Sequence, residues 1–296
     1  KLIGKESIII IPNQIPQNIM FILEGVPYII SENKYQDAKR RLKLTDLLFV
    51  VDMNNNTRVN EPLENLLNTI TPKTVLIDHH VKPDKYDIKF SFPQASSAAE
   101  ICFFIVKKLS TEKIFTKEIA TALLVGISTD TGSFSYSCNH PDVYNAVATL
   151  LKTGVKANKI HQQIFDTYSI NRMNLLGYAI SKKLKIFAKE RAAFIYLSKK
   201  ELNYYHYQIG DLEGVVNYCL KLKDIDFCAL LSERDTKIRM SFRSNDEAID
   251  VNKFANKYWN GGGHVMASGG KSIESLDVVV EKLTSQIKKR LFISND

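Results

Sequence analysis

The chain has 296 residues, of which 24% are charged and 45% hydrophobic, and it carries a formal net charge of +8. This length and composition predict a globular protein with a sizeable core and two domains. The basic balance favours an anionic partner, and no apolar run or signal peptide indicates a membrane segment. The four cysteines are scattered, which is typical of the reduced thiols of a cytosolic, and therefore cytoplasmic, protein.

The first half of the chain alternates strands with helices. Strands are expected at residues 7–12, 28–30, 47–52 and 75–78, and helices at residues 18–24, 35–44, 61–70, 97–109, from 116 onward, 142–152 and within 157–182. Ser97 and Glu100 form a capping box at the start of one helix. This alternation predicts an α/β fold with a doubly wound parallel sheet and helices on both faces.

The second half has a different character. Strands are expected at residues 184–188, 192–197, 226–233 and 237–244, and helices at residues 212–221, 251–258 and 275–290. The last two strands are joined by a three-residue turn, so they read as a hairpin in a mixed or antiparallel sheet. We therefore expect a first domain over residues 1–168, a helical linker over 169–183, and a smaller mixed-sheet domain over 184–296.

The strongest motif is V-L-I-D-H-H, from Val75 to His80. Ligands of open α/β sheets bind beyond the carboxyl ends of the strands, so Asp78, His79 and His80 should emerge into such a crevice. Neighbouring strand residues point to opposite faces, so the two histidines have different roles unless the chain turns. The alternative is a hydrogen-bonded loop cluster without a ligand.

Two further acids could join this motif. Asp52 ends the preceding strand, and Asp130 lies in a turn after a helix within G-I-S-T-D-T-G-S-F. Carboxylates with an imidazole suit Mn²⁺, Mg²⁺ or Zn²⁺, and the mixture favours Mn²⁺. Asp52 could instead cap the following turn, and Asp130 could be an Asx-turn residue.

A glycine run in the second domain is a candidate phosphate site. Gly261, Gly262 and Gly263 leave backbone N–H groups unshielded, and His264 adds a donor beside them. Arg243, at the end of a strand, offers a fork-shaped partner for a second phosphate. The alternatives are a plain flexible loop and an ordinary surface arginine.

Taken in order, four motifs resemble the DHH/DHHA1 phosphoesterase family, and the likeness to its bacterial bifunctional oligoribonuclease and pAp-phosphatase group is close. These motifs are the acid-ending strand, I-D-H-H, G-I-S-T-D-T-G and G-G-G-H-x-x-A-S-G-G. The resemblance covers nearly the whole chain. It implies a parallel-sheet catalytic domain, a helical linker and a substrate-binding domain, in agreement with the expected elements.

The resemblance also implies roles for single residues. Asp52 matches an aspartate that bridges two Mn²⁺ ions, and His79 and Asp130 match ligands of one of them, with Mg²⁺ as another usable ion. His80 faces the substrate phosphate and Asp78 supports it. The glycine run with His264, and Arg243, hold the phosphate or nucleotide end.

Two departures from the family pattern stand out. The first family motif, H-x-x-x-D-x-D, is absent, and Asn260 and Met266 replace a glycine and an asparagine of the last motif. We expect that the natural protein carries roughly 35–50 further residues upstream, enough for a strand, a loop and a helix. The strand near Ile8 should then not pair directly with the strand beginning at Leu47.

The implied activity is manganese-dependent hydrolysis of short oligoribonucleotides and of 3′-phosphoadenosine 5′-phosphate (pAp), with two ions activating water. The alternatives are hydrolysis of cyclic dinucleotides or pApA, and a non-catalytic nucleotide-binding protein. The expected partners are short RNA or a nucleotide phosphate and no membrane, and a homodimer is one oligomeric state to test.

Overall fold

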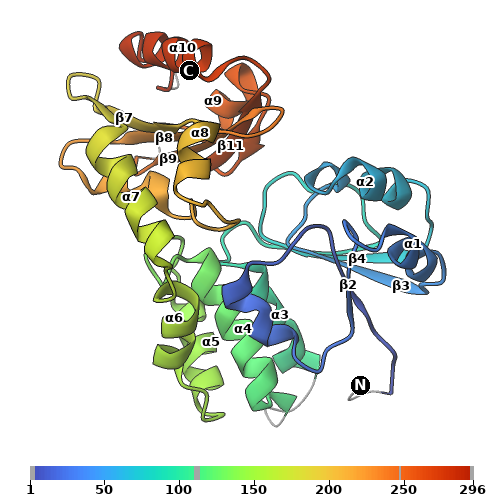
Figure 1. Ribbon diagram of the computed structural model, residues 1–296. Coiled ribbons are helices and arrows are strands. Elements are labelled where there is room, and N and C mark those ends of the chain that lie inside the picture. Colours follow the sequence, from blue (N-terminus) through green and yellow to red (C-terminus); the bar gives the residue numbers. More distant parts are fainter. Residues whose placement is uncertain (1–3, 110–113, 247, 294–296) are drawn as a thin grey trace. The chain divides into compact units, whose positions relative to one another are not determined.

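The computed structural model describes residues 4–109, 114–246 and 248–293. Two compact units, Lys1–Thr167 and Tyr168–Asp296, divide the chain (Figure 1). Each unit has its own β-sheet structure and its own hydrophobic core. No helix within the described ranges is both long and apolar enough to cross a membrane.

Short parallel strands form the centre of unit 1. Strands β3 (Leu47–Val51), β4 (Lys73–Asp78) and β5 (Ile88–Ser91) form one parallel sheet in that order, with β4 in the middle. A separate parallel pair consists of β1 (Ile9–Ile11) and β2 (Tyr28–Ile30). Among the described residues β1 has no ladder to β3, as expected from the sequence.

Helices cover both faces of the β3–β5 sheet. Helices α1 (Tyr35–Lys43) and α2 (Glu61–Leu67) lie on one face, where their buried leucines pack with Leu48 of β3 (Figure 1). Helix α3 (Ala98–Leu109) lies on the other face and packs Ile101 against β4. This arrangement confirms the expected α/β class with a parallel sheet.

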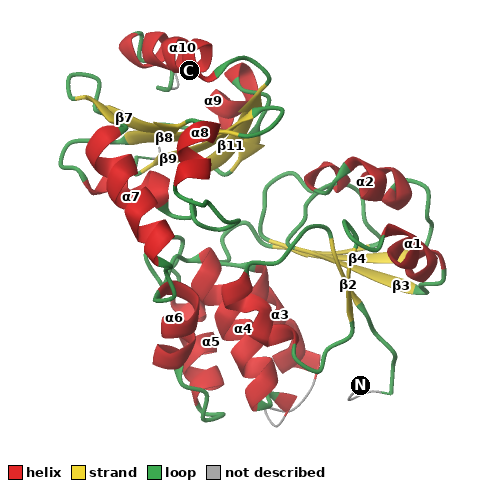
Figure 2. Ribbon diagram, viewed as in Figure 1, coloured by secondary structure: helices red, strands yellow, loops and turns green. Residues whose placement is uncertain are grey.

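The remaining helices of unit 1 form a cluster on α3. They are α4 (Lys117–Asp130), α5 (Pro141–Leu151) and α6 (Ala157–Phe165), which share one apolar core (Figure 2). Helices α3 and α4 approach very closely, since a Cβ at Gly126 would lie 2.6 Å from the Cβ of Ala99. A residue larger than glycine at position 126 would therefore push the two helices apart.

Unit 2 is built on a six-stranded mixed sheet with the order β10-β11-β9-β8-β7-β6. Its strands are β6 (Leu184–Phe187), β7 (Ala192–Leu197), β8 (Phe227–Glu233), β9 (Ile238–Ser244), β10 (Gly262–Gly263) and β11 (Ala267–Ser272). Strands β7 and β8 run parallel, whereas β8 and β9 form an antiparallel hairpin. The expected hairpin and the expected mixed sheet are confirmed.

Two layers of helices enclose this sheet (Figure 2). Helices α9 (Val251–Tyr258) and α10 (Leu276–Lys288) pack on one face, and α7 (Ile170–Lys182) and α8 (Lys199–Tyr204) on the other. The segment expected to be a linker is mainly α7, and its buried residues belong to the core of unit 2. The division into a catalytic and a substrate-binding domain at residues 168 and 184 stays a prediction.

Some elements differ from the expectation. The segments Gln17–Leu23 and Val215–Lys221 are 3₁₀ rather than α-helical. Strand β5 and helix α8 had no clear periodic signal, because both are short. The expected capping box at Ser97 is shifted: Ser97 Oγ accepts from Glu100 N at 3.1 Å, but the Glu100 carboxylate accepts from Ser96 N rather than from Ser97 N.

Candidate metal centre

Asp52 and Asp78 lie at the carboxyl ends of adjacent parallel strands. Strand β3 pairs with β4 so that Val51 lies opposite Ile77, and Asp52 N donates to Ile77 O at 2.9 Å. Asp52 itself has φ +59°, a left-handed conformation that aspartate tolerates better than most residues. The sheet register and this turn of the backbone bring the Asp52 carboxylate back to the end of β4.

His79 is held with one ring nitrogen toward the backbone and the other toward two carboxylates. Its Nδ1 lies 3.1 Å from Ala95 O, so Nδ1 carries a proton and donates to that carbonyl. Its Nε2 lies 3.1 Å from Asp130 Oδ2 and 3.5 Å from Asp52 Oδ1. The backbone contact therefore fixes Nε2 as the nitrogen that faces the acids.

Asp130 comes from the helical cluster. The sequence placed it in a turn after a helix, but the structure has it as the last residue of α4, which corrects that prediction. The chain then turns sharply, with positive φ at Gly132, Ser133 and Phe134, while Thr131 Oγ1 accepts from Phe134 N at 3.0 Å. The helix end thus points the Asp130 carboxylate at His79.

Asp78 and His80 form a second, buried pair. The Asp78 side chain is fully buried, and its Oδ1 lies 2.7 Å from His80 Nδ1. Burial acts to raise the pKa of Asp78, but the hydrogen bond and charge of His80 outweigh it, and the pKa is lowered. Asp78 is therefore ionised at neutral pH and holds His80 with Nε2 directed away from it.

The donor atoms of these residues fit a divalent cation. One ligand atom from each of Asp52, His79 and Asp130 lies within 4.8 Å of the others, and the same holds for Asp52, Asp78 and His80. Asp52 belongs to both groups. Asp78 Oδ2 is buried and has no hydrogen-bond partner among the described residues. Carboxylate oxygens with a neutral imidazole suit Mn²⁺, Mg²⁺ or Zn²⁺.

The two carboxylates strongly affect the protonation of His79. Burial is the largest single influence and lowers its pKa, but the hydrogen bonds of Asp130 and Asp52, the charge of Asp130 and the hydrogen bond of Ala95 together raise the pKa to about 10. Without a metal ion, His79 is therefore protonated at neutral pH. A cation that binds Nε2 has to displace this proton.

We expect Mn²⁺ binding at pH 7.5 to release about one proton, and the affinity to fall as the pH falls. In the absence of metal, the raised pKa of His79 also affects the stability of the fold. The stabilisation is fully present below the pKa of His79 in the unfolded chain, about 6.5, and it is lost as the pH rises through the folded-state pKa of about 10. Calorimetric titration in two buffers of different ionisation enthalpy measures the release, and thermal melting across pH measures the stability. His79→Asn should remove both the proton release and the pH dependence of stability. His140 is an exposed histidine at the N-cap of α5, so the control variant His140→Asn should keep both. Metal binding without proton release would contradict the assignment.

Three neighbours of the centre carried no sequence signal. The backbone carbonyl of Ala95 orients His79, and because every residue has such a carbonyl, no residue type in the sequence marks it. Asn54 is buried and its Nδ2 donates to Val81 O at 2.9 Å, which links the loop after β3 to the loop after His80. Burial, with a smaller effect of the Asp52 charge, raises the pKa of Cys102 to about 11, so this thiol stays neutral and is no thiolate ligand.

The other candidate residues lie together in unit 2. Arg243 of β9 pairs in register with Ala267 of β11, and Gly263 of β10 pairs with Ser268. His264 lies in the turn of this β10–β11 hairpin, where its N donates to Ala267 O at 2.7 Å. Arg243 and the glycine run therefore lie close to one another in this sheet.

The glycines of the run are not equivalent. A Cβ at Gly261 would lie 1.9 Å from Gly269 O, and one at Gly263 would lie 2.5 Å from Ala267 O, so both glycines are required by the hairpin itself. A Cβ at Gly262 would meet only the Asn252 and Asn256 side chains, at 3.4 Å or more. The run is thus partly a paired strand rather than a flexible loop, and Gly262 is its accessible member.

Two domain families match the chain. The DHH family, N-terminal domain, matches residues 3–127, and the DHHA1 domain matches residues 201–289. The first match contains the strand ends described above and stops just before Asp130. The second contains Arg243 and the glycine hairpin.

Curated relatives and a solved structure match as well. A Mycoplasma genitalium protein named bifunctional oligoribonuclease and PAP phosphatase NrnA is 30% identical over 227 residues, 75% of this chain and 68% of that protein. The Bacillus subtilis protein of the same name is 29% identical over 208 residues, 69% of this chain and 64% of that protein, so the match spans less than two thirds of it. An exopolyphosphatase-related protein from Bacteroides fragilis superposes with a TM-score of 0.88 at 29% identity, covering 95% of this chain and 82% of that one.

Proposed function

The chain belongs to the DHH family and carries a C-terminal DHHA1 domain, and on that premise we propose that it is a manganese-dependent phosphoesterase that hydrolyses short oligoribonucleotides and pAp. The observation that carries the proposal is the orientation of His79. Its Nδ1 donates to the Ala95 carbonyl, which leaves Nε2 directed at Asp52 and Asp130. The name of the NrnA relatives supports the choice of substrates.

Asp52, His79 and Asp130 are the residues we propose to hold the ion, with Asp52 shared with a second position beside Asp78 and His80. The mixture of carboxylate and imidazole favours Mn²⁺, and Mg²⁺ is the alternative. When bound, the ion neutralises phosphate charge and acidifies a water molecule. The protein keeps the three side chains converging through the sheet register and the Ala95 contact.

His80 is proposed to bind the substrate phosphate. Its Nδ1 is engaged by the ionised Asp78, and Nε2 is the ring nitrogen proposed to donate to a phosphate oxygen. Because Asp78 is fully buried and His80 nearly so, this donor is fixed in place before the substrate arrives. A fixed donor costs little reorganisation when charge develops on the phosphate.

Unit 2 is proposed to contribute the contacts that select the substrate. The guanidinium of Arg243 suits a phosphate oxygen pair, and the accessible backbone at Gly262, with His264 in the same hairpin, suits the nucleotide end. These contacts are remote from the bond that breaks. Their loss should therefore raise KM more than it lowers kcat.

One assay tests this function against the alternatives. Purified protein is incubated with Mn²⁺, Mg²⁺ or a chelator and with pAp, dinucleotide RNA, pApA or a cyclic dinucleotide, and the products are separated by ion-exchange chromatography. We expect Mn²⁺-dependent release of AMP from pAp and of mononucleotides from the dinucleotide RNA, and no products from His79→Asn. Turnover of the cyclic dinucleotide alone would show that the substrate is a cyclic dinucleotide rather than pAp or short RNA. Binding of pAp without any turnover would identify a non-catalytic nucleotide-binding protein.

A further inference from the structure

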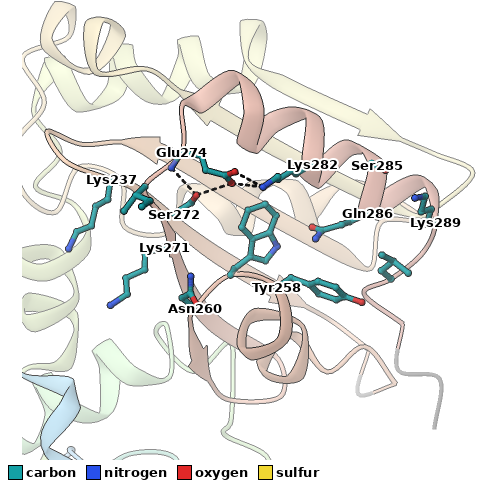
Figure 3. A pocket seen from close by; sticks show the side chains of 13 residues that line it. Lys237, Tyr258, Asn260, Lys271, Ser272, Glu274, Lys282, Ser285, Gln286 and Lys289 are labelled. Carbon is teal, nitrogen blue, oxygen red and sulfur yellow. Dashed lines mark hydrogen bonds and ion pairs between the residues drawn. The ribbon is translucent and has the colours of Figure 1, made fainter.

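Unit 2 contains a cavity that the proposed hydrolysis does not use. It has a volume of about 810 Å³ and opens between the end of α9, the end of β11 and helix α10 (Figure 3). This volume lies within the range of small-ligand sites. Tyr258, Trp259 and Gln286 are among the residues that line it, and its surface is mostly apolar.

The cavity is at the opposite end of strand β9 from Arg243, and Asn260, which precedes the glycine run, is among its lining residues. Along β9, Lys237 precedes the first residue, Ile238, whereas Arg243 is next to the last. In the register of β11, Ser272 lies opposite Ile238 and Ala267 opposite Arg243. Ile238 and Arg243 are five residue steps apart along β9, a distance of about 17 Å.

Two buried polar atoms of the cavity have no protein partner. Trp259 is 3% exposed, and its Nε1 has no hydrogen-bond partner among the described residues. The same holds for Gln286 Oε1, and Figure 3 shows this side chain reaching from α10 toward the middle of the cavity. Buried donors and acceptors are nearly always paired, so this donor and acceptor indicate a polar ligand.

The position of Trp259 depends on a glycine of the motif. A Cβ at Gly270 would lie 2.9 Å from Trp259 Cβ and 3.1 Å from Phe242 Cε2. Lys271 N donates to Trp259 O at 2.8 Å, which fixes the tryptophan backbone against β11. The Trp259 backbone is thus fixed at the cavity wall.

Lysines surround the mouth of the cavity. Lys237 and Lys271 extend from one side, and Lys289 lies on the opposite side (Figure 3). Lys282 is also present, but Glu274 neutralises it, with Lys282 Nζ 2.7 Å from Glu274 Oε2. The net charge at the mouth is therefore positive and suits a phosphate.

We propose that this cavity binds a nucleoside monophosphate. The base lies in the apolar part against Tyr258, where Trp259 Nε1–H and Gln286 Oε1 supply one donor and one acceptor to its hydrogen-bonding edge. Lys237 and Lys271 hold the phosphate on one side of the mouth, and Lys289 on the opposite side adds to the positive charge there. An inorganic phosphate alone would leave the buried donor and acceptor unused, and a neutral nucleoside would leave the lysines unused.

Trp259 allows a direct test because it is the only tryptophan of the chain. Its fluorescence is followed while AMP, adenosine, ribose 5-phosphate or inorganic phosphate is added to the full chain in the presence of a chelator. Calorimetry detects binding that leaves the fluorescence unchanged. We expect saturable binding of AMP, and at least about tenfold weaker binding of each of the three fragments.

Variants locate the binding. Lys271→Ala and Lys289→Ala should each weaken AMP binding by about threefold to tenfold, as should Gln286→Leu. Lys200→Ala removes the same charge on α8, outside the cavity, and should bind AMP like the unchanged protein. Arg243→Ala removes the other proposed phosphate contact of unit 2, so AMP binding that persists in this variant belongs to the cavity.

Three results would overturn the proposal. The first is no heat and no fluorescence change with AMP. The second is AMP binding that Arg243→Ala abolishes and the Lys271 and Lys289 variants leave intact, which would place the ligand at the glycine hairpin. The third is equal affinity for AMP and for inorganic phosphate or adenosine, because the cavity would then not recognise a nucleotide.

Discussion

Asp130→Asn is expected to lower Mn²⁺-dependent hydrolysis by more than about 100-fold while leaving the fold intact. Loss of a residue that only supports a metal ligand typically lowers metal affinity or activity by about 10–100-fold. Asp130 is proposed to be a ligand itself, so its loss should have a larger effect. Its carboxylate lies 3.1 Å from His79 Nε2 and is 37% exposed, so little packing depends on it. Turnover of pAp and thermal melting of the same preparation measure the two effects.

Glu118→Gln provides the matched control for Asp130→Asn. It removes one carboxylate charge from the same helix, in the first turn of α4 and at the other end from Asp130. We expect its turnover to equal that of the unchanged protein within about twofold. Near-normal turnover of Asp130→Asn would show that Asp130 is no metal ligand.

Gly261→Ala is expected to destabilise unit 2 by more than about 3 kcal/mol, which is among the largest effects of a single methyl group. The new Cβ would lie 1.9 Å from Gly269 O and 2.7 Å from Gly270 Cα, and both neighbours are backbone of the β10–β11 hairpin. Neither can move without loss of strand pairing. Denaturant unfolding followed by Trp259 fluorescence measures the change in the free energy of unfolding.

Gly262→Ala is the partner experiment. Its Cβ would meet the Asn252 Oδ1 atom at 3.4 Å, an ordinary contact, so the stability should change by less than about 0.5 kcal/mol. If a phosphate approaches the backbone here, KM should rise with kcat nearly unchanged. A stable Gly261→Ala protein would contradict the hairpin geometry, and an unchanged KM for Gly262→Ala would remove Gly262 from the substrate site.

The strand ends of unit 1 could be predicted because the determining signal is local. Apolar runs that stop at Asp52 and Asp78 give the strands, and parallel pairing brings their carboxyl ends to one edge. The convergence of His79 with both acids then follows from topology. The orientation of its ring does not, because the Ala95 carbonyl comes from a loop 16 residues away.

Other features depended on tertiary context. Residues Gly269 and Gly270 lie in strand β11, although glycine weakens strands, because β9 on one side and β10 on the other supply the pairing. The end of α4 at Asp130 rather than before it depends on the Thr131 hydroxyl, which bonds both Ile127 O and Phe134 N. Such side chain to backbone bonds shift a helix end by a residue or two.

Because α3 and α4 approach closely at Gly126, a substitution at this packing residue can affect activity although Gly126 is not proposed to bind metal or substrate. Asp130 lies four residues, or about one helical turn, after Gly126, so a displacement of α4 moves the Asp130 carboxylate with it. The acids at the strand ends do not move with that helix. A methyl group added at position 126 would therefore alter the spacing between the proposed metal ligands while both helices remain folded. Activity could then be lost without loss of the fold.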